Sequence, residues 1–251
     1  MVGGFGSEEK SSPGRHCVGC IFTHAEFAAP RGDGVITAIL FDLDGTLVDS
    51  APGILSGFRT VLAAAGIAPV EAIDSRVIGP PLRSTLARLS GLHDAGQIEH
   101  LANAFITVYD TEGVLNAKGY PGAADLLAQL VASGRAPFIV TNKRLVPARI
   151  MAERLGLAPH LAGLYSLDSF SPPAAKKGAV VAHVLAEHGI AASAAVLVGD
   201  SIDDAEAAAA NGVPFIAATY GYGAPLTFPG IAPAATLDQL ADLPRVLRGL
   251  E

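Results

Sequence analysis

Two carboxylates two residues apart, Asp42 and Asp44, have the spacing in this 251-residue chain that most directly suggests chemistry. They follow an apolar run at residues 35–41, which is typical of a buried parallel strand. Open α/β sheets bind ligands at the carboxyl ends of their strands. The pair Asp44-Gly45 is equally typical of a β-hairpin turn, but a turn does not explain Asp42. These residues alone leave both interpretations open.

Three further polar clusters favour the chemical interpretation, because they also stand at the ends of predicted strands or the start of a helix. Residues that end different strands of a parallel sheet converge on one rim. Carboxylates, a hydroxyl and a lysine together predict a site for a hard cation, Mg²⁺ rather than zinc, beside an anion site. The clusters are Thr141-Asn142-Lys143 after residues 136–140, Gly199-Asp200-Ser201-Ile202-Asp203-Asp204 after residues 195–198, and Lys176-Lys177 at the start of a helix.

Strand and helix patterns alternate in two blocks, 35–53 and 119–251, and together predict an α/β core with a doubly wound, Rossmann-like parallel sheet. Between them, residues 54–118 contain helical spacing and no strand-like run, which predicts an inserted all-helical domain. The last helix is expected to open with a capping box at residues 236–239. Residues 1–34 have no apolar periodicity, and we expect a flexible tail or leader there.

The composition excludes several classes of function. Half of the residues are hydrophobic and 16% are charged, which favours a sizeable core. The net charge of −7 and the absence of basic runs argue against nucleic acid as a partner. With no membrane span and no secretory signal, the sequence predicts a cytoplasmic protein. Cys17 and Cys20, near His16 and His24, could bind zinc or simply belong to the tail.

The four clusters, in their order along the chain, resemble the four motifs of the haloacid dehalogenase superfamily. The resemblance extends from about residue 35 to the C-terminus, and the helical insertion resembles the C1 cap of that family. Within the superfamily, residues 42–50 and 78–82 are similar to the phosphoglycolate phosphatase-like and 5′-nucleotidase-like branches.

The resemblance implies a role for each motif residue. Asp42 would be the nucleophile that forms an aspartyl-phosphate, and Asp44 would be the general acid and base. Mg²⁺ would be held by Asp42, the backbone carbonyl of Asp44 and Asp200, with Asp204 in support. The Thr141 hydroxyl and the Asn142 backbone N–H would hold phosphoryl oxygens, and Lys177 would balance their charge.

Several assignments have alternatives. Lys176 and Lys177 would point about 100° apart on a helix, so only one can serve the site, and the family's offsets favour Lys177. The family's spacing likewise favours Asp204 over Asp203, which would then cap a helix. Arg83 could reach a substrate carboxylate or phosphate, or could be an exposed helix residue. Lys143 and Arg144 are surface charges or anion contacts.

Asp44 also distinguishes among the reactions of the superfamily, because its dehalogenases lack a carboxylate at this place. Residues 54–117 contain no lysine, which argues against a phosphonatase with a Schiff-base lysine in the cap. The leading hypothesis is a Mg²⁺-dependent phosphatase for a small phosphomonoester of the phosphoglycolate type. The alternatives are a 5′-nucleotidase, a sugar phosphomutase and a non-catalytic phosphate-binding module.

Overall fold

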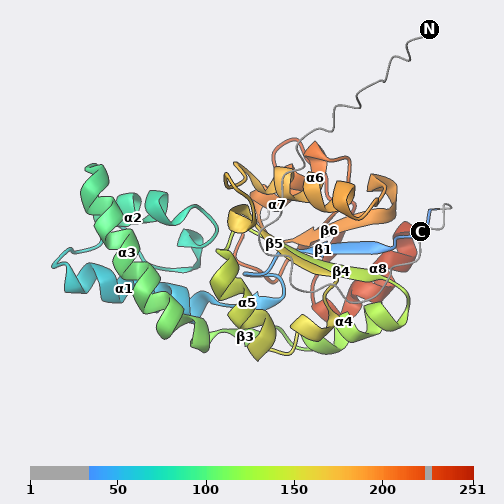
Figure 1. Cartoon of the computed structure of the whole chain (residues 1–251), viewed down its shortest axis with the longest axis horizontal. Coiled ribbons are helices and arrows are strands. Elements are labelled where there is room, and N and C mark those ends of the chain that lie inside the picture. Colours follow the sequence, from blue (N-terminus) through green and yellow to red (C-terminus); the bar gives the residue numbers. More distant parts are fainter. Residues whose placement is uncertain (1–33, 224–227) are drawn as a thin grey trace, which may run out of the picture.

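A six-stranded parallel sheet forms the centre of the larger part of the molecule (Figure 1). The computed structural model describes residues 34–223 and 228–251. The strands are arranged in the order β5-β4-β1-β6-β7-β8, so β1 lies between β4 and β6. Their bounds are β1 Ala38–Phe41, β4 Ala136–Thr141, β5 Gly163–Ser166, β6 Ala195–Gly199, β7 Phe215–Ala218 and β8 Ala235–Leu237.

Helices cover both faces of this sheet, as expected for a doubly wound fold (Figure 1). Side chains alternate along β1: Ala38 and Leu40 pack on the face covered by α6 and α7, and Ile39 and Phe41 pack on the face of α4, α5 and α8. All four are buried, which explains the continuous apolar run in the sequence. The helices are α4 Ala123–Ala132, α5 Leu145–Arg154, α6 Lys177–Glu187, α7 Ile202–Ala210 and α8 Leu243–Leu250.

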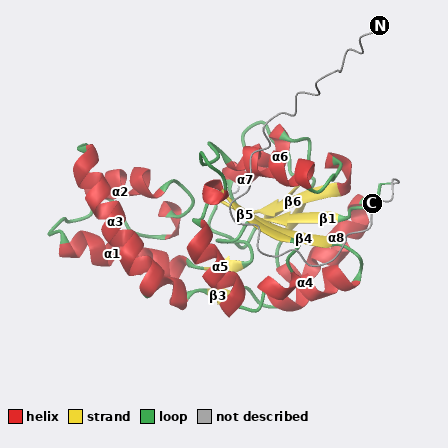
Figure 2. Cartoon of the chain, viewed as in Figure 1, coloured by secondary structure: helices red, strands yellow, loops and turns green. Residues whose placement is uncertain are grey.

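Three helices, α1 Ala51–Ala64, α2 Leu82–Ser90 and α3 Ala95–Thr111, form a separate group, which we call the helical unit. Figure 2 shows them beside the sheet, with loops but no strand among them. The chain enters this unit after β2 Val48–Asp49 and leaves it before β3 Lys118–Gly119, and these two short strands pair antiparallel. The two chain segments that connect the sheet to the helical unit are therefore paired with each other.

Close packing of α1 on α3 depends on a glycine. A Cβ atom at Gly57 would clash with the ring of Phe105, so only glycine lets the two helices approach this closely. The rings of Phe58 and Phe105 then lie 4.6 Å apart, and Phe105 stacks on Tyr109 at 5.5 Å. Such ring pairs stabilise a core beyond the area that they bury. They form the interior of the helical unit.

The structure corrects two predictions about helix starts. Thr236 lies in strand β8, and α8 begins at Leu243, so the capping box predicted at residues 236–239 is wrong. Asp203 lies inside α7, whose N-cap is Ser201. Strands β5 and β8, at the two edges of the sheet, were not predicted, because Gly-Leu-Tyr-Ser and Ala-Thr-Leu contain no continuous run of large apolar residues.

No helix in the described ranges, 34–223 and 228–251, is both long and apolar enough to cross a membrane. The zinc site considered at Cys17 and Cys20 lies outside the described residues.

Candidate active site

The rim formed by the carboxyl ends of the central strands brings the predicted site residues together. Asp42 follows β1 directly, Thr141 ends β4, and Asp200 follows β6 directly. Because β4, β1 and β6 are neighbours and parallel, their ends lie side by side. Asp42, Thr141 and Asp200 are each at most 6% exposed, so this rim is a buried polar site.

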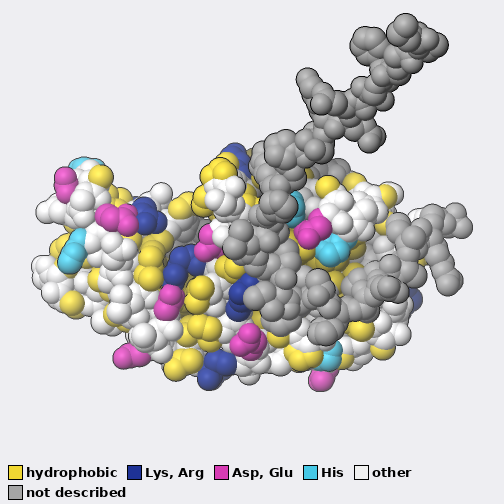
Figure 3. Space-filling model, in the orientation of Figure 1, with side chains coloured by type: hydrophobic (Ala, Val, Ile, Leu, Met, Phe, Trp, Pro, Cys, Tyr) yellow, Lys and Arg dark blue, Asp and Glu magenta, His cyan; other side chains and the backbone are white. Residues whose placement is uncertain are grey.

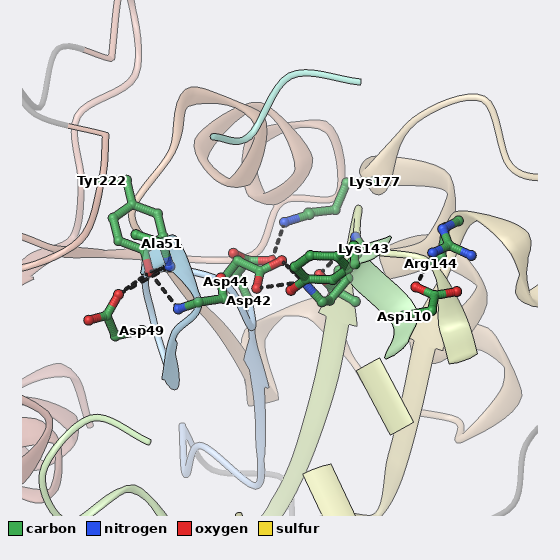
Figure 4. Close-up of polar contacts among 12 residues, drawn as sticks. Asp42, Asp44, Asp49, Ala51, Asp110, Lys143, Arg144, Lys177 and Tyr222 are labelled. Carbon is green, nitrogen blue, oxygen red and sulfur yellow. Dashed lines mark hydrogen bonds and ion pairs between the residues drawn. The ribbon is translucent and has the colours of Figure 1, made fainter. Parts of the chain in front are cut away.

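Lys177 joins two of the predicted carboxylates. Its ammonium group donates to Asp42 Oδ1 at 2.7 Å (Figure 4). It also donates to Asp204 Oδ1 at 2.6 Å. The Lys177 side chain is 4% exposed, whereas the neighbouring Lys176 is exposed. Of the two adjacent lysines, the structure thus brings Lys177 to the carboxylates, as the family's offsets suggest.

Asp204 is held in place by the start of its own helix. Its carboxylate accepts hydrogen bonds from the Ser201 backbone N–H at 3.0 Å and from the Ser201 hydroxyl at 2.5 Å, while the Ser201 Oγ accepts from the Asp204 N–H. This capping box turns one carboxylate oxygen to the helix end and leaves the other to Lys177. The local sequence therefore fixes the orientation of Asp204.

Asp200 is enclosed by backbone from two loops. Its carboxylate accepts from the N–H groups of Tyr222 at 2.6 Å and Gly223 at 3.3 Å. A Cβ atom at Gly45, whose φ is +89°, or at Gly221 would overlap this carboxylate. Glycine at these two positions is what allows the backbone to pack against Asp200.

Burial dominates the electrostatics of these carboxylates. It raises the pKa of Asp42 to about 8, with the charges of Asp204 and Asp200 acting in the same direction against the lowering effect of Lys177. Burial and the charge of Asp204 likewise raise the pKa of Asp200 to about 6. Burial alone would lower the pKa of Lys177, but Asp204 and Asp42 outweigh it and raise that pKa. In this cluster, the carboxyl groups outnumber the ammonium groups.

A divalent cation fits this arrangement. Oxygen atoms of Asp42, Asp200 and Asp204 lie within 4.8 Å of one another. With these acids ionised, three carboxylates face one ammonium group, Lys177, and the excess is two negative charges. Carboxylate oxygens are the ligands that Mg²⁺ prefers, and a bound cation would lower the carboxyl pKa values. The residues present therefore suit a magnesium ion.

The side chain of Asp44 stands apart from this cluster and has a cation of its own. Lys143 donates to both Asp44 oxygens, at 3.0 and 3.1 Å, and to the hydroxyl of Tyr109 at 2.7 Å. The Lys143 side chain is 5% exposed, so it is not a surface charge. No local pattern indicates this contact, because residues 44, 109 and 143 are far apart along the chain.

Thr141 and Asn142 lie beside the carboxylates, where the resemblance implied a phosphate site. The Thr141 Oγ1 accepts from the Lys143 backbone N–H at 3.1 Å. The Asn142 amide donates to Asp203 at 2.9 Å, so Asp203 orients Asn142 instead of capping α7. Both residues line the cavity described next.

A cavity of about 660 Å³ lies between this rim and the helical unit. Its opposite wall is mostly apolar, and its floor contains the charged residues Asp42, Asp44, Lys143, Lys177 and Asp200. On the face of the molecule shown in Figure 3, acidic, basic and hydrophobic side chains lie next to one another where the helical unit meets the sheet-containing part. The apolar wall is formed by Ile54, Phe58, Val77, Ile78, Pro80, Pro81, Leu82, Phe105 and Ile106.

Arg83 also lines the cavity, but its guanidinium already has a partner. It forms two hydrogen bonds with Glu99 of α3, at 2.6 and 2.8 Å, and its side chain is 57% exposed. In this arrangement Arg83 links α2 to α3. The pair uses Nε and Nη2 of Arg83, so Nη1 is the nitrogen that could contact a substrate, as the sequence suggested, while the pair stays intact.

Comparison with known proteins identifies the family. Residues 39–218 match the model of the haloacid dehalogenase-like hydrolases. This chain belongs to the haloacid dehalogenase-like hydrolase family. The match runs from β1 to β7 and includes the helical unit.

Relatives and a solved structure agree with this membership. A phosphoglycolate phosphatase of Rhodospirillum rubrum is 34% identical over 194 residues, which cover 74% of this chain and 80% of the relative. A 5′-nucleotidase of Pseudomonas aeruginosa is 31% identical over 83% of this chain and 94% of its own length. A haloacid dehalogenase-like family hydrolase of Streptococcus pneumoniae superimposes with a TM-score of 0.73 at 30% identity, covering 84% of this chain and 97% of that chain.

The predicted fold class and enzyme class are therefore confirmed: an α/β core with an inserted helical domain, and a phosphomonoester hydrolase of the haloacid dehalogenase-like family. The roles of the individual residues and the domain boundaries, 35–53 and 119–251 for the core and 54–118 for the cap, remain predictions.

Proposed function

We propose that this protein is a Mg²⁺-dependent phosphatase that hydrolyses a small phosphorylated metabolite through an aspartyl-phosphate on Asp42. The observation that carries the proposal is the contact of Asp42 with Lys177 inside a group of three buried carboxylates. A carboxylate and a dianionic phosphate repel each other, so attack requires positive charge at this place. Lys177 supplies part of that charge.

Asp42 would attack phosphorus with one carboxylate oxygen. As the new oxygen–phosphorus bond forms, the bond from phosphorus to the leaving oxygen breaks, and Asp44 gives that oxygen a proton. Asp44 then takes a proton from water, whose oxygen bonds to phosphorus and releases phosphate and Asp42. Thr141, the Asn142 backbone and Lys177 would hold the phosphoryl oxygens during both steps.

A magnesium ion, when bound, would screen the negative charges of the phosphoryl group and the carboxylates. We assign it to Asp42, Asp200 and the backbone carbonyl of Asp44, with Asp204 supporting the site. The backbone N–H groups of Tyr222 and Gly223 would keep Asp200 oriented towards it.

Phosphoglycolate is the first substrate to test, because a relative named phosphoglycolate phosphatase aligns with 74% of this chain. A nucleoside monophosphate is the second, supported by the 5′-nucleotidase relative and by the apolar wall of the cavity. The apolar wall suits the ring of a base better than it suits a carboxylate, which needs a cation or donors.

Hydrolysis of an aryl phosphate tests the reaction separately from the substrate. The wild-type protein should be active with Mg²⁺ and inactive after chelation, with activity restored when Mg²⁺ is added back. Asp42→Asn keeps the shape but removes the nucleophile, and should lower kcat by on the order of 10⁴-fold. No activity in the wild type, or undiminished activity in Asp42→Asn, would contradict the proposal.

A further inference from the structure

Lys143 is a buried cation that joins the rim of the sheet to the helical unit. Its ammonium group lies within 3.1 Å of both Asp44 oxygens and 2.7 Å from the Tyr109 hydroxyl on α3. It also lies 4.6 Å from the centre of the Tyr109 ring. Three acceptor atoms and an aromatic ring therefore surround this one ammonium group, which has three protons to donate.

This arrangement restrains Asp44. A lysine that is 5% exposed must keep its partners, because a buried charge without them is costly. The Asp44 side chain is itself 17% exposed and thus not fixed by packing alone. Its contact with Lys143 holds the carboxyl group on the side of the site that faces the helical unit.

A second link between the same two segments lies next to the first. Arg144 pairs with Asp110, so neighbouring residues of α3 contact neighbouring residues after β4 (Figure 4). This pair is more exposed, at 37% for Arg144 and 23% for Asp110, and the structure shows no contact between it and Asp44. The two links can therefore be broken separately, one with an effect on Asp44 and one without.

We propose that Lys143 is a positioning residue that, while held by Tyr109 of the helical unit, keeps the Asp44 carboxyl group directed at the leaving oxygen of a bound phosphomonoester. The inference rests on the proposed role of Asp44 as acid and base. Protonation of the leaving oxygen then depends on contact between α3 and the rim, so Asp44 works fully only while the helical unit covers the site.

The dependence on the leaving group tests this role. A poor leaving group needs its oxygen protonated as it departs, whereas nitrophenolate does not. Lys143→Met should lower kcat/KM, which covers the steps up to departure of the leaving group, by about 10²-fold for an alkyl phosphate and by less than about tenfold for p-nitrophenyl phosphate. Tyr109→Phe, which retains the ring, should shift the ratio of the two kcat/KM values in the same direction by a smaller factor.

Asp110→Asn is the matched control, because it breaks the neighbouring link and leaves Lys143 in place. It should leave the ratio of the kcat/KM values for the two substrates unchanged. Circular dichroism establishes that each variant is folded, and Tyr109→Phe gives the answer if Lys143→Met does not fold. Equal losses on both substrates would overturn the role of Lys143 while leaving the phosphatase proposal standing. Absence of hydrolysis by the wild type would overturn both.

Discussion

The two walls of the cavity differ in almost every physical property. The rim of the sheet carries buried charges held by short hydrogen bonds, and most come from residues directly after a strand or at the start of a helix. The wall from the helical unit is mainly apolar, and its one cation, Arg83, is paired with Glu99. The rim has the groups that a phosphoryl transfer needs, and the opposite wall has surface that can select a leaving group.

This difference follows from how each wall is built. The carboxyl ends of parallel strands lie at the same edge of the sheet, whatever the length of the segments that connect the strands. The rim therefore brings together polar residues that are far apart in sequence. Helices packed by Phe58 and Phe105 present apolar side chains on the side that faces the cavity. We therefore expect substitutions in the rim to affect all substrates and substitutions in the helical unit to affect their ranking.

After the loss of the nucleophile in Asp42→Asn, the largest effect is expected at the two adjacent lysines. Lys177→Met leaves three buried carboxylates without a counter-charge, and should lower activity by about 10³-fold and the free energy of unfolding by roughly 3–5 kcal/mol. Lys176→Met, at the exposed neighbour, should change the free energy of unfolding by less than about 0.5 kcal/mol. Urea unfolding and phosphatase assays measure both. Equal effects at the two positions would contradict the assignment of Lys177.

A smaller effect is expected in the apolar wall. Ile106 of α3 lines the cavity and is half-buried. Ile106→Ala should change the ratio of kcat/KM between a ring-bearing phosphate and phosphoglycolate by roughly tenfold, because contacts of a few methylenes contribute that much to selection. Val131→Ala, on an exposed part of α4, is the control and should leave the ratio unchanged. An unchanged ratio in Ile106→Ala would show that this wall does not contribute to substrate selection.

The smallest effect should come from the contact between the rim and the start of α1. The Tyr222 hydroxyl accepts from the N–H groups of Ser50 at 2.7 Å and Ala51 at 3.0 Å, and donates to Asp49 at 2.7 Å (Figure 4). Tyr222→Phe should therefore lower the free energy of unfolding by about 1–3 kcal/mol, measured by urea unfolding.

Tyr220→Phe provides the comparison, since the Tyr220 hydroxyl makes one bond, to the Thr46 carbonyl at 2.8 Å. Its loss should cost about 1 kcal/mol. If Tyr220→Phe proves as destabilising as Tyr222→Phe, the three hydrogen bonds of the Tyr222 hydroxyl contribute no more to the free energy of unfolding than the one bond of Tyr220.

The sequence predicted the rim better than the edges of the sheet. Strands β1, β4, β6 and β7 are buried on both faces, and their continuous apolar runs are visible in the sequence. Edge strands β5 and β8 begin with the small residues Gly163 and Ala235, contain no continuous run of large apolar residues, and resemble loops in the sequence. Thr236 matched a capping pattern although it lies in a strand, because a four-residue motif contains no information on the pairing of β7 with β8.

The same limit applies to the candidate site. Asp42 and Asp200 could be predicted because each stands directly after a strand, where topology decides its place. The choice of Lys177 over Lys176 came from the offsets of the family that the motifs resemble. The contact of Lys143 with Asp44 and Tyr109 could not be predicted, because it depends on how the helical unit packs on the rim. Nor does spacing indicate that Arg83 pairs with Glu99, sixteen residues away on another helix.

The measurement that tests the division between the two walls most directly is a substrate panel run on three proteins. Phosphoglycolate, nucleoside monophosphates and sugar phosphates would be assayed with the wild type, with Asp200→Asn in the rim and with Ile106→Ala in the helical unit. We predict that Asp200→Asn lowers kcat/KM for every substrate by the same factor, and that Ile106→Ala changes the order of preference. A changed order of substrate preference in Asp200→Asn, or the same fractional loss of kcat/KM for every substrate in Ile106→Ala, would contradict the account.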